Sequence, residues 1–169
     1  MRARLAWLGL LGLAACGGPQ PQLQFDFVLS ALLADQISEL QVSLVTNGKS
    51  LGNGDCVTVQ SNCLNKQITA DRFIRVQDAS GVEHRALRFA LSLKPAGANS
   101  SQDVTVQGIP LGKDYGLVIE ALSKDNPPQL AGSTCDYVQE INAGMNPRKL
   151  AIAIKPLTPP VNCDPRVEK

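Results

Sequence analysis

Residues 104–122 have the sequence Val-Thr-Val-Gln-Gly-Ile-Pro-Leu-Gly-Lys-Asp-Tyr-Gly-Leu-Val-Ile-Glu-Ala-Leu, in which two apolar segments flank a turn that contains Gly and Pro. Short apolar segments bounded by turn residues are typical of β-strands. We therefore expect strands at 104–106 and 115–122, joined through this turn.

The chain before and after this stretch follows the same pattern. Residues 23–29 and 40–44 alternate between apolar and more polar side chains, as expected of strands with one buried face. Between them, apolar residues at helical spacing predict a short helix or an irregular crossover. Further strands are expected at 72–77, 87–93, 130–137 and 150–154, the first two forming a hairpin around a turn at 78–81.

Eight or nine such short segments, without a long helix, predict an all-β fold. The expected architecture is an antiparallel β-sandwich of about eight strands. Four aromatic side chains on the alternating positions are expected to fill its core: Phe25, Phe27, Phe73 and Phe89.

Residues 104–122 also resemble the E–F corner of fibronectin type III and other immunoglobulin-like sandwiches, where a Pro-x-Gly-x-x-Tyr turn leads into a strand. The resemblance implies that the Tyr115 hydroxyl bonds back to the backbone of the corner. Further along, residues 130–154 supply two strands where fibronectin type III has one, and are more similar to prealbumin-like or carboxypeptidase-regulatory-like sandwiches. These resemblances concern the fold and not the function.

The N-terminus carries Arg2 and Arg4, an apolar run at residues 5–13, and then Leu13-Ala14-Ala15-Cys16. A helix of nine residues is only ~14 Å long, about half the hydrocarbon thickness of a bilayer. The segment resembles the signal peptide and lipobox of bacterial lipoproteins. That resemblance implies cleavage before Cys16, a diacylglyceryl group on its thiol and an acylated amine, as with palmitate. An ordinary secretory signal is the alternative.

This resemblance also predicts where the protein lies and how the chain is divided. Gly17 follows the lipidated cysteine, which favours the outer membrane of the cell envelope. We expect the following organisation: a signal peptide at 1–15, a flexible tether at 16–22, one β-sandwich domain at 23–156, and a Pro-rich tail at 157–169 that covers a sheet edge.

Four cysteines remain in the expected mature chain: Cys56, Cys63, Cys135 and Cys163. An even number in an exported protein predicts two disulfides. Of the three possible connectivities, we favour Cys56–Cys63, which closes a local loop, and Cys135–Cys163, which fastens the tail. A four-thiolate zinc site is the alternative, but these cysteines lack the close paired spacing of zinc ribbons.

The charge balance excludes some classes of partner. Removal of residues 1–15, with their two arginines, leaves 14 basic and 15 acidic side chains. A nearly neutral chain without a Lys/Arg cluster argues against nucleic acid and against a polybasic membrane contact, so the lipid is the expected link to the membrane.

The catalytic motifs are incomplete. Gly48-Lys49-Ser50-Leu51-Gly52 matches a nucleophile elbow, but a polar loop follows Ser50 where a helix is required, and the lone His84 lies in an expected turn. We therefore expect neither an enzyme, nor a cofactor, nor a metal. The predicted function is an accessory, structural or protein-interaction module with an envelope protein as partner. The alternatives are a small-ligand or carbohydrate binder and, less favoured, a serine hydrolase that uses Ser50.

Overall fold

The computed structural model describes residues 22–51, 56, 59–96, 99–142 and 148–167. The predicted signal peptide, Cys16 and all but the last residue of the tether lie outside these described residues. The strands are β1 Leu23–Ser30, β2 Ile37–Thr46, β3 Val76–Gln77, β4 Glu83–His84, β5 Leu87–Ala90, β6 Lys94–Ala96, β7 Asn99–Val106, β8 Gly112–Ser123, β9 Leu130–Ile141, β10 Arg148–Ala153 and β11 Lys155–Val161. The helices are α1 Ala31–Gln36 and α2 Leu64–Gln67, with 3-10 turns η1 Gly48–Leu51, η2 Val59–Ser61 and η3 Ala70–Arg72.

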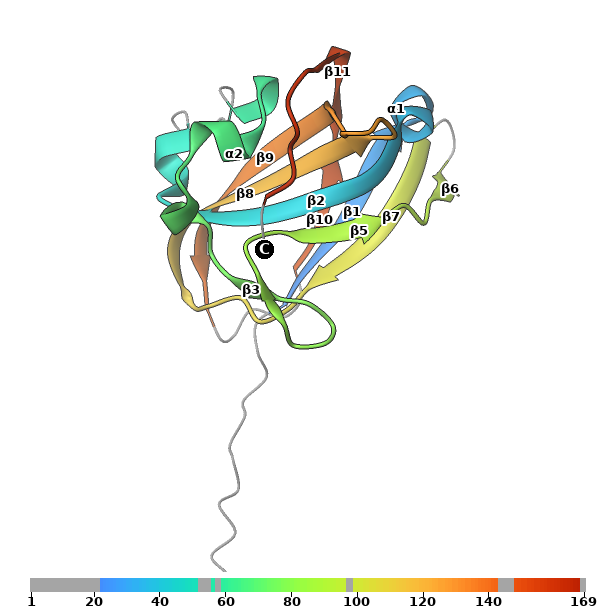
Figure 1. Cartoon of the computed structure of the whole chain (residues 1–169). Helices are drawn as coiled ribbons and strands as arrows, with labels where there is room; N and C mark the ends of the chain where they lie inside the picture. The colour runs from blue at the N-terminus through green and yellow to red at the C-terminus, as the bar shows by residue number, and fades with distance from the viewer. Residues whose placement is uncertain (1–21, 52–55, 57–58, 97–98, 143–147, 168–169) are drawn as a thin grey trace, which may run out of the picture.

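The structure is an all-β sandwich, as predicted from the strand pattern (Figure 1). Within the described ranges, one sheet has the order β10-β1-β7-β6 and the other has the order β11-β9-β8-β2-β5. The strands β3 and β4 form a separate small hairpin. One pair departs from the expected antiparallel arrangement, because β1 and β10 run parallel.

The main core lies between the two sheets. The alternation in strand β1 predicted its buried face correctly. The buried residues are Leu23, Phe25, Phe27 and Leu29, and the residues between them are half-buried. The facing sheet contributes apolar residues that alternate in the same way, among them Leu40, Val42, Leu44, Leu117 and Ile119. Phe89 packs against this core from β5.

The short helix expected between the first two strands is α1. Ser30 caps it, since its hydroxyl accepts a hydrogen bond from the Leu33 amide at 3.3 Å. Leu33 is buried, and the chain turns directly from α1 into β2. The helix therefore closes one end of the sandwich as a tight crossover between the sheets.

The predicted hairpin of 72–77 with 87–93 is wrong. The turn at 78–81 closes only the two-residue strands β3 and β4, where Val76 pairs with His84. Strand β5 instead pairs with β2, in the register Val42 to Leu87 and Leu40 to Phe89. Pairing with the edge of β2 gives β5 a longer ladder than β3 would, and it packs Leu87 and Phe89 on the main core. The long-range pairing is therefore more stable than the local hairpin.

The boundary predicted at residue 156 falls inside a strand. β11 pairs with the edge of β9, with Lys155 opposite Ser133 and Val161 opposite Leu130. Its prolines, Pro156, Pro159 and Pro160, suit an edge strand because an edge residue can lack an amide donor without breaking a ladder on both sides. The tail covers a sheet edge, as expected, but it is part of the sandwich.

Tyr115 forms the hydrogen bond expected of a tyrosine corner. Its hydroxyl donates to the Pro110 carbonyl at 3.2 Å, and its ring belongs to the main core. A side chain at Gly112 would collide with this hydroxyl, so the corner requires a glycine there. The interaction fixes the connection between β7 and β8 against the core.

We expect Tyr115→Phe to lower the free energy of unfolding by about 1 kcal/mol, because it removes one partly buried hydrogen bond and keeps the ring. Urea unfolding measures the difference. Tyr137→Phe is the matched control, since Tyr137 is only half-buried and lies outside both core clusters. Equal stability of the two variants would show that the Tyr115 hydroxyl contributes nothing.

Candidate functional site

The outer face of the five-stranded sheet is covered by two segments far apart in the sequence (Figure 1). The first, which we call the covering segment, comprises residues 59–75 and carries η2, α2 and η3. The second, the C-terminal segment, comprises residues 162–167. A second apolar cluster forms beneath them: Val45, Leu51, Val59, Leu64, Phe73, Val118 and Val167. Strands β2 and β8 are consequently buried on both faces.

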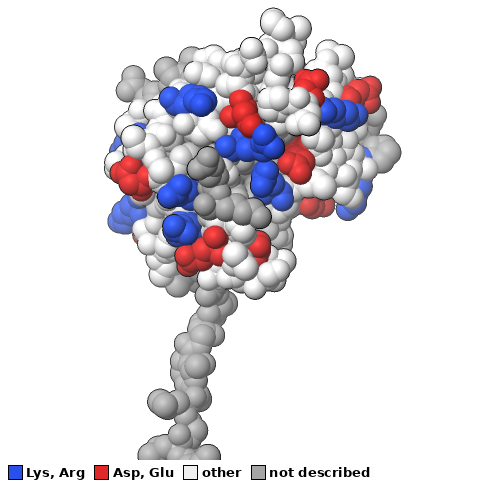
Figure 2. All heavy atoms as spheres, in the orientation of Figure 1, with Lys and Arg blue, Asp and Glu red and all other residues white. Residues whose placement is uncertain are grey.

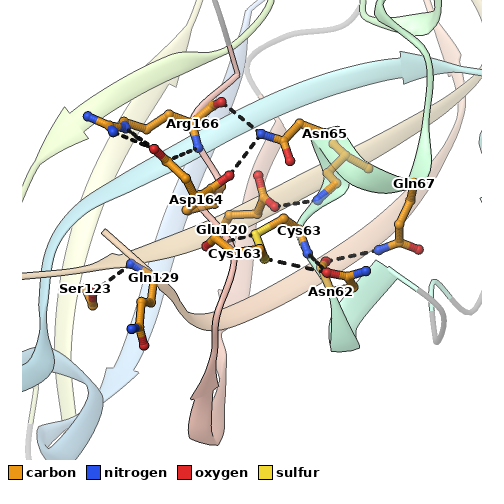
Figure 3. The surroundings of a disulfide bond; sticks show 12 residues. Asn62, Cys63, Asn65, Gln67, Glu120, Ser123, Gln129, Cys163, Asp164 and Arg166 are labelled. Atoms are coloured by element: carbon orange, nitrogen blue, oxygen red, sulfur yellow. Dashed lines mark hydrogen bonds and ion pairs between the residues drawn. A yellow bond between two sulfur atoms is a disulfide. The ribbon is translucent and has the colours of Figure 1, made fainter. Parts of the chain in front are cut away.

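Side-chain amides hold the C-terminal segment, and Figure 3 shows one of them, Asn65, directed at the backbone of Asp164 and Arg166. Gln41, on β2, donates to the Pro165 carbonyl at 2.8 Å and accepts from the Val167 amide at 3.1 Å. Asn65, on α2, donates to the carbonyls of Asp164 and Arg166 at 3.1 and 2.9 Å. The C-terminal segment lies outside the strand ladders, so its backbone groups bond instead to the side chains of Gln41 on the sheet and Asn65 on the covering segment.

Glu120 lies buried at the centre of this layer, opposite Gln41 in the pairing of β2 with β8. Its carboxylate accepts from the Gln41 side chain at 2.7 Å and from the Leu64 amide at 2.8 Å. Burial raises the pKa of Glu120 to about 7, although both hydrogen bonds act to lower it. The carboxyl therefore ties together the sheet, α2 and, through Gln41, the C-terminal segment.

The two disulfides join this layer to the sandwich, but not in the predicted pairs. Cys56 is bonded to Cys135 of β9, and Cys63 is bonded to Cys163, with Cα separations of 5.5 and 6.3 Å. The predicted pairs Cys56–Cys63 and Cys135–Cys163 are wrong. The cause is the course of the chain on this face of the sheet: Cys56, which precedes the covering segment, lies against β9, and Cys63, within that segment, lies against the C-terminal segment.

Beside this layer lies a groove that we define by two neighbouring cavities. The first, of about 250 Å³, is lined by the cationic residues Lys66, Arg85 and Arg166 and by an apolar set that includes Ile68, Phe73 and Val167. The second, of about 210 Å³, shares Val167 and adds Asp78, His84 and Arg88. Figure 2 shows Lys and Arg side chains grouped around the middle of this face, with acidic groups among them.

The charges in the groove are unevenly balanced. Arg166 binds the Asp164 carboxylate through Nε, at 2.9 and 3.0 Å, and this contact lowers the pKa of Asp164. Neither Lys66 nor Arg85 makes an ion pair with any described residue. Within the described part of the chain, the groove therefore holds two cations without an ion-pair partner next to apolar side chains, an arrangement that suits an anionic group carried on an apolar body.

The two candidate catalytic side chains are bound to other partners. Ser50 donates to the Asn47 carbonyl at 2.7 Å and accepts from Arg72 at 2.8 Å. His84 contacts the Asp78 carboxylate at 2.7 Å, and only 14% of its side chain is exposed. The expectation that His84 lies in a turn is wrong, because it belongs to β4, where its side chain contacts Asp78. Gly52, the last residue of the elbow motif, lies outside the described residues.

Sequence reasoning missed Glu120, Gln41 and the groove. Gln41 and Glu120 occupy outward positions of their strands, where polar residues are ordinary, and only the covering segments bury them. The groove cations come from α2, from the chain before β5 and from the C-terminal segment, so no local pattern links them. A carboxylate within the otherwise apolar Leu117–Leu122 was the one available signal.

No family model, no curated protein and no solved structure matches the chain. Among the described residues, no helix has the length and apolar character to cross a membrane. The same described ranges contain no group of three or more His, Cys, Asp or Glu side chains placed to hold a metal ion.

Proposed function

We propose that the protein is a lipoprotein of the bacterial cell envelope, anchored through Cys16, whose β-sandwich is a non-catalytic module that binds an acidic segment of an envelope protein. The observation that carries the anchor is Leu13-Ala14-Ala15-Cys16, directly after a short apolar run. The two disulfides agree with an oxidising compartment such as the periplasm. The outer membrane is the favoured location because Gly17 follows the anchor.

The groove supports binding as the role of the module. Lys66 and Arg85 make no ion pair with a described residue, and apolar side chains that include Phe73 line the same cavity. An acidic side chain of a partner, flanked by an apolar one, would satisfy both parts of the groove. Ser50 and His84, which a hydrolase would need, are engaged in hydrogen bonds to Asn47, Arg72 and Asp78.

The alternative of a carbohydrate or small-ligand binder has weaker support. Sugar rings stack on aromatic faces, and among the described residues that line the first cavity only Phe73 is aromatic. The cations around it favour an anionic group over a neutral sugar. We therefore place protein binding before ligand binding.

Capture from detergent-solubilised envelopes tests this proposal. The baits are the full chain, Cys16→Ala, and the double variant Lys66→Glu/Arg85→Glu, with mass spectrometry of the bait's N-terminus and of its companions. We expect an acylated Cys16 and a stoichiometric partner with the full chain, and loss of that partner, by at least about tenfold, with the double variant. Higher salt should weaken capture as well.

The matched control is Lys94→Glu/Lys124→Glu, which changes the net charge equally at two exposed lysines outside the groove. Capture that survives the groove reversal would contradict the assigned surface. An unmodified N-terminus would contradict the anchor. Ester hydrolysis by the purified chain that Ser50→Ala abolishes would contradict the non-catalytic role.

A further inference from the structure

Three large apolar side chains are strongly exposed within the described ranges: Leu32 at 60%, Val82 at 53% and Leu111 at 56%. Leu32 lies in α1, Val82 lies in the turn between β3 and β4, and Leu111 lies in the connection between β7 and β8. Single exposed apolar residues are common on protein surfaces. Two of the three, Val82 and Leu111, lie near the start of β1, and this position distinguishes them from Leu32.

Val82 and Leu111 belong to the same end of the sandwich, the end where β1 begins. Leu23 pairs with Val106, so the connection that carries Leu111 leaves β7 beside the start of β1. Gln77 bridges to Gln107, which holds the β3–β4 hairpin against that connection. Figure 1 shows β3 and its turn at this end and α1 at the opposite end.

Leu32 serves as the reference for the opposite end. β1 runs for eight residues from Leu23 to Ser30, and α1 follows at once. At a rise of about 3.3 Å per residue, the strand separates the two ends by roughly 25 Å. A surface that touches Leu111 and Val82 is therefore out of reach of Leu32.

The chain before β1 limits where the lipid can lie. Five residues lie between Cys16 and Gln22, and the six steps from one Cα to the other span at most ~20 Å in a fully extended chain. If Cys16 carries the lipid, as in the proposed function on which this inference rests, the bilayer lies within that distance of the start of β1.

We propose that this end of the sandwich rests on the bilayer that holds the anchor, with the side chains of Leu111 and Val82 in its interfacial layer. The anchor keeps the two side chains at a high effective concentration beside the lipid, so even a weak apolar contact is occupied.

The charges at this end are compatible with shallow contact. Lys113 and Glu140 approach within 3.7 Å, and the Asp78 carboxylate contacts His84, so these three charged groups each have a partner within the sandwich. Glu83 directly follows Val82 and is exposed. Its carboxylate belongs among the headgroups, which limits the depth that Val82 can reach.

Tryptophan fluorescence tests the contact, because Trp7 is the only tryptophan of the sequence and lies in the predicted signal peptide. The lipidated full-length product is purified in three variants, Leu111→Trp, Val82→Trp and the control Leu32→Trp, and reconstituted into phosphatidylethanolamine/phosphatidylglycerol vesicles. Part of the lipid carries brominated acyl chains, which quench nearby indoles. All three sites are more than half exposed, so the folded core is left intact.

We expect a blue-shifted emission maximum and several-fold stronger bromine quenching for Leu111→Trp and Val82→Trp than for Leu32→Trp. Mass spectrometry of the N-terminal peptide accompanies each sample. A lipidated Cys16 with equal quenching at all three sites overturns the membrane contact and leaves the proposed function standing. An unmodified Cys16 in a protein that stays out of the membrane fraction overturns both.

Discussion

Replacing both Cys63 and Cys163 with alanine should lower the free energy of unfolding by about 4–5 kcal/mol, because the bond closes a loop of 100 residues in the unfolded chain. The same change should release the C-terminal segment, whose other contacts include the hydrogen bonds from Gln41 and Asn65 and the burial of Pro165 and Val167. Urea unfolding measures the first effect. Hydrogen exchange in peptides that contain residues 162–167 measures the second.

Cys56→Ala/Cys135→Ala is the matched control. Its bond spans 79 residues, so the loss of stability should be similar, yet the C-terminal segment should keep its protection from exchange. Peptide mapping without reduction reports the connectivity directly. A peptide that links Cys56 to Cys63, or equal exchange of residues 162–167 in both double variants, would contradict the structure of this layer.

The second large effect concerns Glu120 and pH. Its pKa is about 7 in the folded protein and near 4.5 when the chain is unfolded, so between these values the folded state holds a proton that the unfolded state has released. The stabilising contribution of Glu120 is then fully present below pH 4.5 and is lost as the pH rises through about 7. The expected total loss from this carboxyl is about 3 kcal/mol.

Glu120→Gln isolates this contribution, because it removes the titration and keeps the shape of the side chain. The variant should lose one hydrogen bond, because its amide nitrogen is only a donor and its single oxygen replaces just one of the two acceptors that Gln41 and Leu64 use. Its stability should therefore lie below that of the wild type at pH 4.5 and approach it at pH 8. Urea unfolding across this range measures the difference.

Other carboxyls act in a different pH range. The pKa values of Asp78 and Asp164 are lowered in the folded protein by their contacts with His84 and Arg166. Their stabilising contribution is present above pH 4 and is lost as the pH falls below it.

The outcome that would contradict the Glu120 prediction is a constant difference in the free energy of unfolding between the wild type and Glu120→Gln from pH 4.5 to 8. It would show that the Glu120 carboxyl does not titrate as its burial implies.

The fold could be predicted wherever one face of an element packs on the core between the sheets. The apolar side chains of β1, from Leu23 to Leu29, alternate because that strand has one fully buried face. Tyr115 and Gly112 mark a turn whose geometry is local. Such features depend on neighbours in the sequence, and the sequence contains them directly.

The remaining structure depends on contacts between distant segments. β5 pairs with the edge of β2, in the register of Val42 with Leu87, and not with β3, the strand that precedes the turn at 78–81. The cysteines pair across the covering layer, and no apolar periodicity in the sequence predicts that layer. The candidate site lies in this same layer, which is why Glu120 and the groove cations were missed.

The position of β1 within its sheet also determines how the protein responds to mechanical load. β1 lies between β7 and β10, with paired residues along both of its sides. A force that enters the chain ahead of Leu23, and is resisted at the far end of the sandwich, pulls β1 along its own axis. Its hydrogen bonds to both neighbours are then sheared together and not opened one by one, so the strand nearest the proposed anchor is arranged to withstand tension.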